Sequence, residues 1–266
     1  MRRCGWIGWA AVAVGVIGCS KREPPAGSVA FQVATRHPPG VPLAAPEATT
    51  AAAGALATGD SVVVTLGRDT VILRRVELVL TQIMLSPMES GHCDPDDPNE
   101  CSTVEAGPVL LQLPLGDQAE HRTTVRAPAD RYIVLHLQIH RPDAQRDSAF
   151  LAAHPEFANT SVRVQGTFSR AGRRREFVFA TDFNEQEETD ITPPMIVAAD
   201  STARLTLRLN VATWFLSAEK TALVDPATAG PGQPHEHLVK DNIRMSVRTF
   251  EDVNSDGLDD PAPADQ

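Results

Sequence analysis

Two cysteines enclose an acidic stretch in GHCDPDDPNECS, residues 91–102. Residues of this kind could bind a metal ion, form a redox pair or close a loop through a disulfide. A thiolate zinc site needs further ligands, and no histidine pair lies near Cys93 and Cys101 at ligand spacing. A redox pair more often has the C-x-x-C spacing. The choice therefore depends on the compartment in which the chain resides.

A second group of oxygen ligands lies in DVNSDGLDD, residues 252–260. D-x-N-x-D-G is the pattern that begins an EF-hand loop, with ligands at positions 1, 3 and 5 and glycine at position 6. The candidate calcium ligands are Asp252, Asn254, Asp256, Asp259 and Asp260. Position 12 is Pro263 instead of the bidentate glutamate, so an orthodox EF-hand is not expected. The alternatives are a shorter, weak calcium loop and a solvated acidic tail.

The remaining polar clusters have plain structural explanations beside their chemical ones. His136 and His140 share one face of an expected strand but lie about 13 Å apart, too far to share one ion, so we interpret them as unrelated surface residues. The HEH segment, residues 235–237, could surround a metal ion or begin a helix. The acid-rich segment 182–190 could supply paired carboxylates for hydrolysis or form a solvated loop.

Enzyme motifs are otherwise lacking. The sequence contains no G-x-S-x-G motif, no phosphate-binding glycine loop and no dinucleotide fingerprint. We therefore expect a non-enzymatic binding or structural module. The alternatives are a calcium-dependent adhesion or ligand-binding domain, and a hydrolase that uses the acidic segment. No cofactor is expected, with calcium as the alternative if the segment 252–260 binds it.

The N-terminus indicates export. Arg2 and Arg3 precede a short apolar run, residues 5–18, of the length of a signal-peptide core and too short to span a bilayer. VIGC, residues 16–19, closes the run and resembles the bacterial lipobox. This resemblance implies a lipoprotein signal peptide over residues 1–18 and a lipidated Cys19 that anchors the mature chain in a membrane.

Export resolves the cysteine question. Ser20 follows the anchor, and the absence of aspartate there favours the outer membrane over the inner one by resemblance to the enteric sorting rule.

The expected processing accounts for two of the four cysteines. Cys4 leaves with the signal peptide, and Cys19 carries lipid. Cys93 and Cys101 then remain in an oxidising compartment, where a disulfide is expected. A loop this small should gain about 2–3 kcal/mol from the bond.

Composition excludes one class of partner. The chain has a formal charge of −10, and residues 251–266 contain six acids and no base. A nucleic-acid partner is therefore not expected, because that role requires a basic face. The expected partners are a membrane, through the N-terminal lipid, and an envelope protein or ligand whose identity the sequence does not give.

Hydrophobic patterning predicts the elements. Residues 19–58 are rich in Ala, Pro, Thr and Gly and are interpreted as a flexible tether after the lipidated cysteine, with SVAFQVATR as a weak strand signal. Strands are expected at 61–66, 70–87, 108–115, 121–128, 131–141, 161–170, 174–183, 190–198 and 203–211. A change of phase predicts a bulge near Thr81–Gln82. One short helix is expected within 146–157, and a C-terminal helix over 236–252.

These elements predict one mainly β domain over residues 59–251, followed by an acidic tail, residues 252–266. The expected fold is an antiparallel β-sandwich of Greek-key type with two or three short helices. The order of VELVLTQIML, the cysteine loop, GPVLLQLPL, RYIVLHLQIH, FVFATDF and LTLRLNVATWF resembles a group of bacterial envelope lipoproteins. This resemblance implies a transthyretin-like or immunoglobulin-like domain and no catalytic residue.

Overall fold

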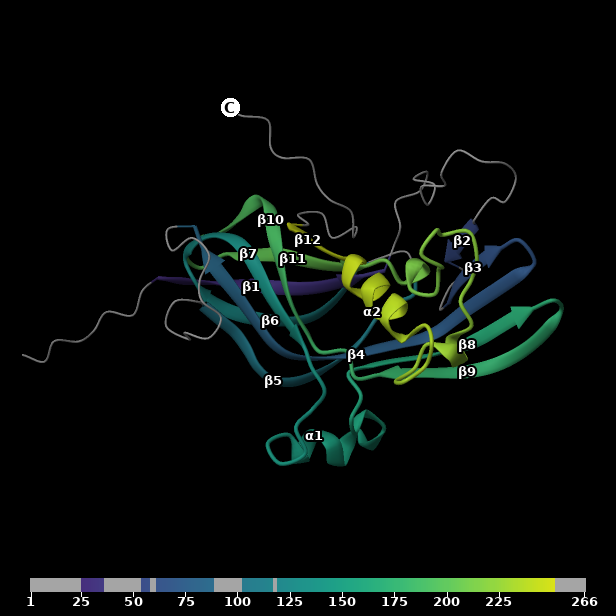
Figure 1. Ribbon diagram of the computed structural model, residues 1–266. Helices are drawn as coiled ribbons and strands as arrows, with labels where there is room; N and C mark the ends of the chain where they lie inside the picture. Colours follow the sequence, from purple (N-terminus) through teal and green to yellow (C-terminus); the bar gives the residue numbers. More distant parts are fainter. Residues whose placement is uncertain (1–24, 36–53, 58–60, 89–101, 117–118, 252–266) are drawn as a thin grey trace, which may run out of the picture.

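The computed structural model describes residues 25–35, 54–57, 61–88, 102–116 and 119–251. Within these ranges the chain is mainly β, with two sheets that form a sandwich, as the sequence predicts (Figure 1). The strands are β1 (Ala26–Ala34), β2 (Gly54–Ala57), β3 (Val62–Leu66), β4 (Asp69–Pro87), β5 (Ser102–Gln112), β6 (Glu120–Pro128), β7 (Asp130–Ile139), β8 (Val162–Arg170), β9 (Arg173–Thr181), β10 (Glu185–Val197), β11 (Thr202–Leu209) and β12 (Val247–Glu251). The α-helices are α1 (Ser148–Ala153) and α2 (Glu236–Met245).

The first sheet has the order β12-β11-β1-β6. β1 lies in its interior, antiparallel to β6 and parallel to β11, so the sandwich contains one parallel pair. Val29, Phe31 and Val33 alternate along β1 and enter the core. The prediction of a tether over residues 19–58 is therefore wrong for β1 and β2. The surrounding segment is rich in alanine, which weakened the strand signal of β1. In addition, its pairing partner β11 lies far away in the sequence, so the local pattern does not reveal the pairing.

The second sheet is organised around β4, a strand of 19 residues. The first half of β4 pairs with β3 on one side and β8 on the other, and its second half pairs with β5 and β7. β9 continues the sheet beyond β8, and β10 continues it beyond β7. The register shifts between Leu80 and Gln82 toward both β5 and β7, which confirms the predicted bulge. β4 thus joins two halves of one elongated domain (Figure 1).

The two halves are covered differently. The first sheet packs on the β5-β4-β7-β10 half, with Leu205 and Leu207 facing a core that includes Leu80 and Leu135. The segment after β11 contributes to the core of the other half, where β3, β8 and β9 lie. Phe215 lies edge-on to the rings of Phe177 and Phe179, with centroids 5.8 and 5.3 Å away.

The C-terminal helix is shorter than predicted. α2 ends at Met245, and Val247–Glu251 forms β12, which pairs with the edge of β11. Val247 and Phe250 fit both a helical stripe and a strand, so spacing alone could not place them. Val239 and Ile243 are buried on α2 as expected. Trp214 is also fully buried, and its Nε1 donates to Ser246 Oγ at the end of the helix, at 2.9 Å.

Other predictions agree with the structure. α1 lies within the expected segment 146–157, and β10 ends its sheet as an edge strand, although it begins at Glu185 instead of Asp190. The two residues between β8 and β9 form the predicted hairpin turn.

None of the helices in the described ranges has the length and apolar character needed to cross a bilayer.

Candidate functional site

Several predicted site residues lie outside the described ranges. They are the lipidation residue Cys19, the disulfide pair Cys93 and Cys101, and the calcium ligands Asp252, Asn254, Asp256, Asp259 and Asp260. The lipid anchor, the disulfide and the calcium loop stay predictions.

His136 is not a surface residue as the sequence suggested. Its exposed fraction is 3%, and its Nε2 lies 2.8 Å from Ser86 Oγ on the neighbouring strand β4. Its Nδ1 lies 3.9 Å from Glu188 Oε2 on β10, on the other side. The prediction failed because the face of β7 that carries His136 is also buried near its centre, which an alternating pattern does not reveal. His140 is half-buried at the end of the strand.

Ser86, His136 and Glu188 follow the order of groups in a serine–histidine–acid triad. Their setting differs from that of a nucleophile. Ser86 is fully buried and is the next-to-last residue of β4, where the register toward β7 shifts. It does not lie on a sharp strand-to-helix turn that presents its hydroxyl. The carboxylate is also beyond hydrogen-bond distance of the imidazole. We therefore interpret the Ser86–His136 contact as one that satisfies two buried polar groups.

The acidic segment 182–190 does not form a carboxylate-lined loop. From Glu185 onward it belongs to β10, whose alternating side chains point to opposite faces. Asp182 instead pairs with Lys240 of α2, with 2.9 Å between Oδ1 and Nζ, and Lys240 also contacts Glu236 at 2.8 Å. The hydrogen bond from Lys240 lowers the pKa of Asp182 below its ordinary range. These groups form an ion-pair network that fixes α2 to the end of β9.

The HEH segment, residues 235–237, also makes structural contacts around the start of α2. His235 precedes α2, and its Nδ1 lies 2.9 Å from Thr228 Oγ1. The carboxylate of Glu236 accepts a hydrogen bond from the backbone N–H of Gly232. His237 is exposed. Among the described residues no three His, Cys, Asp or Glu side chains gather in a way that could hold a metal ion.

The strongest concentration of charge lies elsewhere, at the tips of two neighbouring hairpins. The β3–β4 turn contains Gly67 at φ 63° before Arg68, which is typical of a type II′ turn. The β8–β9 turn contains Ala171 and Gly172 at φ 51° and 78°, as a type I′ turn requires. Because β4 pairs with β8, both tips lie at the same end of the molecule (Figure 1).

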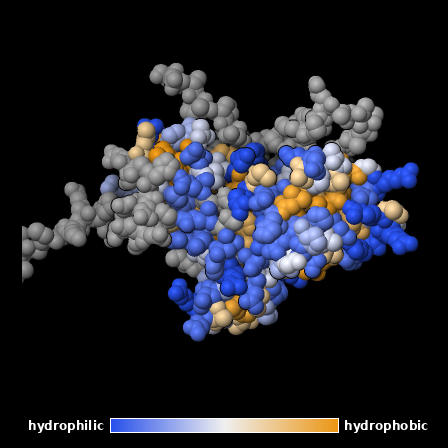
Figure 2. Space-filling model, viewed as in Figure 1, coloured by the Kyte–Doolittle hydropathy of each residue, from blue (hydrophilic) through white to orange (hydrophobic). Residues whose placement is uncertain are grey.

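We call this region the arginine end. It consists of Arg68, Arg170, Arg173, Arg174 and Arg175. The nearest acids that pair with them are Asp69 and Asp225, so five positive charges face two negative ones in a chain whose net charge is −10. Figure 2 shows strongly hydrophilic side chains projecting from this end. The described part of the molecule therefore has a locally positive pole.

Two of these arginines are held in place by the fold. Arg170 pairs with Asp69 at 2.8 Å and donates to the carbonyl of Leu223. Arg175 pairs with Asp225, the N-cap residue of a short 3₁₀ turn. Both guanidinium groups lie over the ring of Phe168, at 5.0 and 5.6 Å from its centroid. These contacts give the tip a fixed shape.

The other three arginines are available to a ligand. The side chains of Arg68 and Arg173 make no hydrogen bond or ion pair with any part of the chain that the structure describes. Arg174 makes only a long contact, 3.4 Å from Nη2 to Thr167 Oγ1. A hollow of about 530 Å³, which we call the tip hollow, opens among Phe168, Arg170, Ala171, Arg173, Arg174, Arg175 and Asp225. Its guanidinium lining can hold carboxylate or phosphate oxygens.

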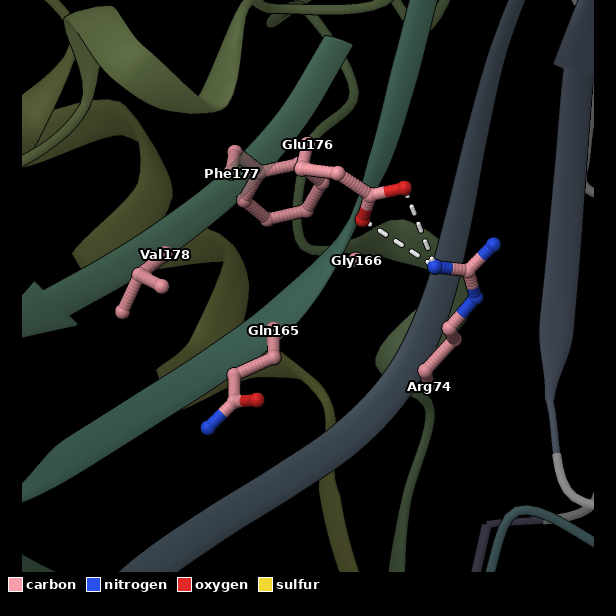
Figure 3. Close-up of a pocket in the computed structure, with 6 residues that line it drawn as sticks. All are labelled: Arg74, Gln165, Gly166, Glu176, Phe177 and Val178. Carbon is pink, nitrogen blue, oxygen red and sulfur yellow. Dashed lines mark hydrogen bonds and ion pairs between the residues drawn. The ribbon is translucent and has the colours of Figure 1, made fainter.

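A second hollow of about 310 Å³ lies farther along the same hairpin (Figure 3). This outer hollow is lined by Arg74, Gln165, Gly166, Glu176, Phe177 and Val178. Arg74 Nη1 donates to both carboxylate oxygens of Glu176, at 3.0 and 3.2 Å. The backbone of Gly166 is closely packed, since an added Cβ would lie 3.0 Å from the Phe177 ring and 2.1 Å from the carbonyl oxygen of Ile72. Val178 is 61% exposed at the rim.

Comparison with known proteins adds no relative. No family model matches the chain, and neither the curated proteins nor the solved structures give a match. Any role of the arginine end must therefore be inferred from its geometry alone. The sequence SRAGRRRE contained the signal for it, as a two-residue turn flanked by basic residues. From the sequence alone, the same segment predicts only a hairpin turn.

Proposed function

We propose that this protein is a non-enzymatic, lipid-anchored binding module of the cell envelope, and that the arginine end is its anion-binding surface. The observation that carries the proposal is the gathering of five arginines on two hairpin tips. Among the described residues, the side chains of Arg68 and Arg173 have no partner, and that of Arg174 has only a long contact with Thr167. An isolated surface arginine needs no such explanation. Several that converge around one hollow, in an acidic chain, favour an anionic ligand.

The rigidity of the tip supports a binding role. Both turns are two-residue loops with backbone angles that suit their strands, and Arg170 and Arg175 are fixed by ion pairs and by Phe168. A preorganised surface loses less conformational entropy when a ligand binds. A few charge-assisted hydrogen bonds to a ligand can then give a favourable net free energy of binding.

The proposed anchor gives this surface a direction. Six residues separate Cys19 from the start of β1, so a lipid at Cys19 would hold that end of the domain within about 20 Å of the bilayer. The arginine end lies at the opposite end of the sheets from the start of β1 (Figure 1). An anchored molecule would therefore present its arginines away from its own membrane.

Binding of a simple polyanion tests this proposal. We expect the full chain in detergent to bind fluorescein-labelled poly-glutamate, with an affinity that falls as salt rises. Arg173→Glu combined with Arg174→Glu should weaken binding about tenfold or more. Arg126→Glu with Arg131→Glu makes the same charge change at exposed positions of the opposite end and should leave binding within about twofold. Equal loss in both double variants would refute the assignment.

The anchor requires its own experiment. Cys19→Ala should move the protein from the membrane fraction to the soluble fraction, or leave the precursor unprocessed. Normal membrane retention at mature size would remove the lipid anchor from the proposal and leave the arginine end untouched.

A further inference from the structure

We infer that the partner of the arginine end is an extended acidic polypeptide segment, and that it binds by adding a strand to the open edge of β9. This inference rests on the proposed function and names the ligand class for the same site. Two features of the β8–β9 hairpin support it. Arginines occupy the first three positions of β9, and backbone N–H and C=O groups along the outer edge of β9 lack a hydrogen-bond partner among the described residues.

The hairpin turn determines which backbone groups face outward. In a two-residue type I′ hairpin the flanking pair, Arg170 and Arg173, exchanges both hydrogen bonds. Bonded and non-bonded pairs then alternate along the strands. Since β8 and β9 pair without a register shift, the N–H and C=O groups of Arg174, Glu176 and Val178 point away from β8.

These outward groups are open to a partner. Within the described ranges β9 pairs with β8 alone, and no described residue bonds its outer edge through the backbone at these three positions. Farther along, a Cβ on Gly230 would lie 3.7 Å from the carbonyl oxygen of Ala180, so the chain covers the edge there. The open stretch therefore runs from Arg174 to Val178, enough for a segment of about five residues. An unpaired edge of this kind is a template for strand addition.

The side chains indicate which segment would fit. Arg173, Arg174 and Arg175 occupy consecutive positions, so their guanidinium groups alternate between the two faces of the sheet. A partner strand would need acidic residues opposite them on both faces. Beyond them lie exposed Val178 and the outer hollow beside Phe177, which suit an apolar side chain. The preferred segment thus has consecutive acids at one end and apolar residues at the other.

The arginines would also select against other strands. Charged residues on an edge strand hinder pairing with neutral or basic segments, which protects the protein from aggregation. The same charges favour an acidic strand. Protection and recognition are therefore compatible roles for these residues.

Two variants at Val178 separate backbone pairing from charge. Val178→Pro removes one outward N–H, and proline is tolerated on an edge strand when its nitrogen faces solvent. Val178→Thr keeps the N–H and is the matched control. The probe is a labelled eight-residue peptide with alternating Val and Thr followed by three acidic residues. We expect Val178→Pro to weaken its binding about tenfold and Val178→Thr to change it by less than about twofold.

A second pair of probes leaves the protein unchanged. The peptide is N-methylated at alternate residues, on one edge in the first version and on the other edge in the second. Strand addition predicts that one version loses binding about tenfold and the other keeps it. If both methylated peptides bind as well as the parent, while Arg173→Glu with Arg174→Glu still abolishes binding, strand addition is refuted and the anion-binding surface stands. If the parent peptide does not bind while poly-glutamate does, the inference fails in the same way.

Discussion

The Nε atom of Arg170 lies 2.8 Å from Oδ2 of Asp69, and this ion pair joins the β8–β9 tip to the β3–β4 tip. The pair aligns two turns that come from distant parts of the sequence. It also places one negative charge among the five positive charges of the arginine end. Asp69 therefore opposes anion binding electrostatically while it orders the surface that binds.

Replacement of Asp69 by asparagine should separate these two effects. Asp69→Asn removes a negative charge beside the tip hollow, so poly-glutamate binding should tighten by about two- to fivefold. Stability should fall by less than about 1 kcal/mol, because the pair is partly exposed. Fluorescence anisotropy and urea unfolding provide the two measurements. Weaker binding in this variant would show that alignment outweighs charge at this position.

Glu77 on β4 should contribute more to stability than Glu176 on β9, whose side chain is exposed. The Glu77 side chain is 1% exposed and lies 2.7 Å from Arg75 and 3.3 Å from Arg163. Glu77→Gln leaves both guanidinium groups without a counter-charge and should cost about 1–3 kcal/mol in urea unfolding. Glu176→Gln alters an exposed pair with Arg74 and should cost under about 1 kcal/mol. A larger loss for Glu176→Gln would contradict the importance of burial.

The Lys240 network should shape the pH dependence of stability. Hydrogen bonds from Lys240 lower the pKa of Asp182 below 3.8 and that of Glu236 below 4.5. Burial alone would lower the pKa of Lys240, but its bonds to Glu236 and Asp182 raise it above 10.5. The contribution of the carboxylates is complete above about pH 4.5 and disappears as pH falls further, while that of Lys240 is lost above about pH 10.5.

Lys240→Gln should flatten both limbs of this profile. Urea unfolding of the wild-type and variant chains between pH 3 and pH 11 provides the measurement, and the two profiles should converge at the acidic extreme. A difference that stays constant from pH 3 to pH 7 would show that the ion pairs contribute nothing to the acid limb.

Ser246 should stabilise the fold through its bond to Trp214. Ser246→Ala leaves the buried indole N–H without its acceptor, at an expected cost of about 1–3 kcal/mol in urea unfolding followed by circular dichroism. Ser201→Ala is the control, since Ser201 donates to a carbonyl at the exposed end of a turn. Equal costs for both variants would argue against a special role for the indole bond.

Cys93 and Cys101 should form a disulfide in the exported protein. Alkylation without reductant followed by intact-mass analysis should find neither thiol labelled, and labelling after reduction should add two groups. Two labelled thiols in the unreduced native protein would refute the expected bond.

Local patterns predicted the elements that local forces determine. The bulge at Thr81, the β8–β9 turn and the edge position of β10 follow from alternation, turn residues and prolines close to them in the sequence. β1 gave only a weak strand signal within the expected tether, because its strand is stabilised by β11, about 170 residues later. Val247–Glu251 was misassigned for the same reason, since the edge of β11 outweighs a helical spacing.

The candidate site was only partly visible in the sequence. The sequence SRAGRRRE shows a basic turn, but it does not show that Arg68 lies beside this turn. That proximity depends on the pairing of β4 with β8. That pairing brings together turns about 100 residues apart. The burial of His136 was also hidden, because an alternating strand does not show whether its second face is covered.

The length of β4 has a mechanical consequence. This strand extends from the tips at the arginine end toward the opposite end, where β1 begins, and it is bonded to β3, β8, β5 and β7 along the way. A pull between a lipid at Cys19 and a partner held at the arginine end would act nearly parallel to the strands. Many interstrand bonds would then bear the force together instead of opening one by one. The domain is therefore suited to sustain tension applied along β4 between its two ends.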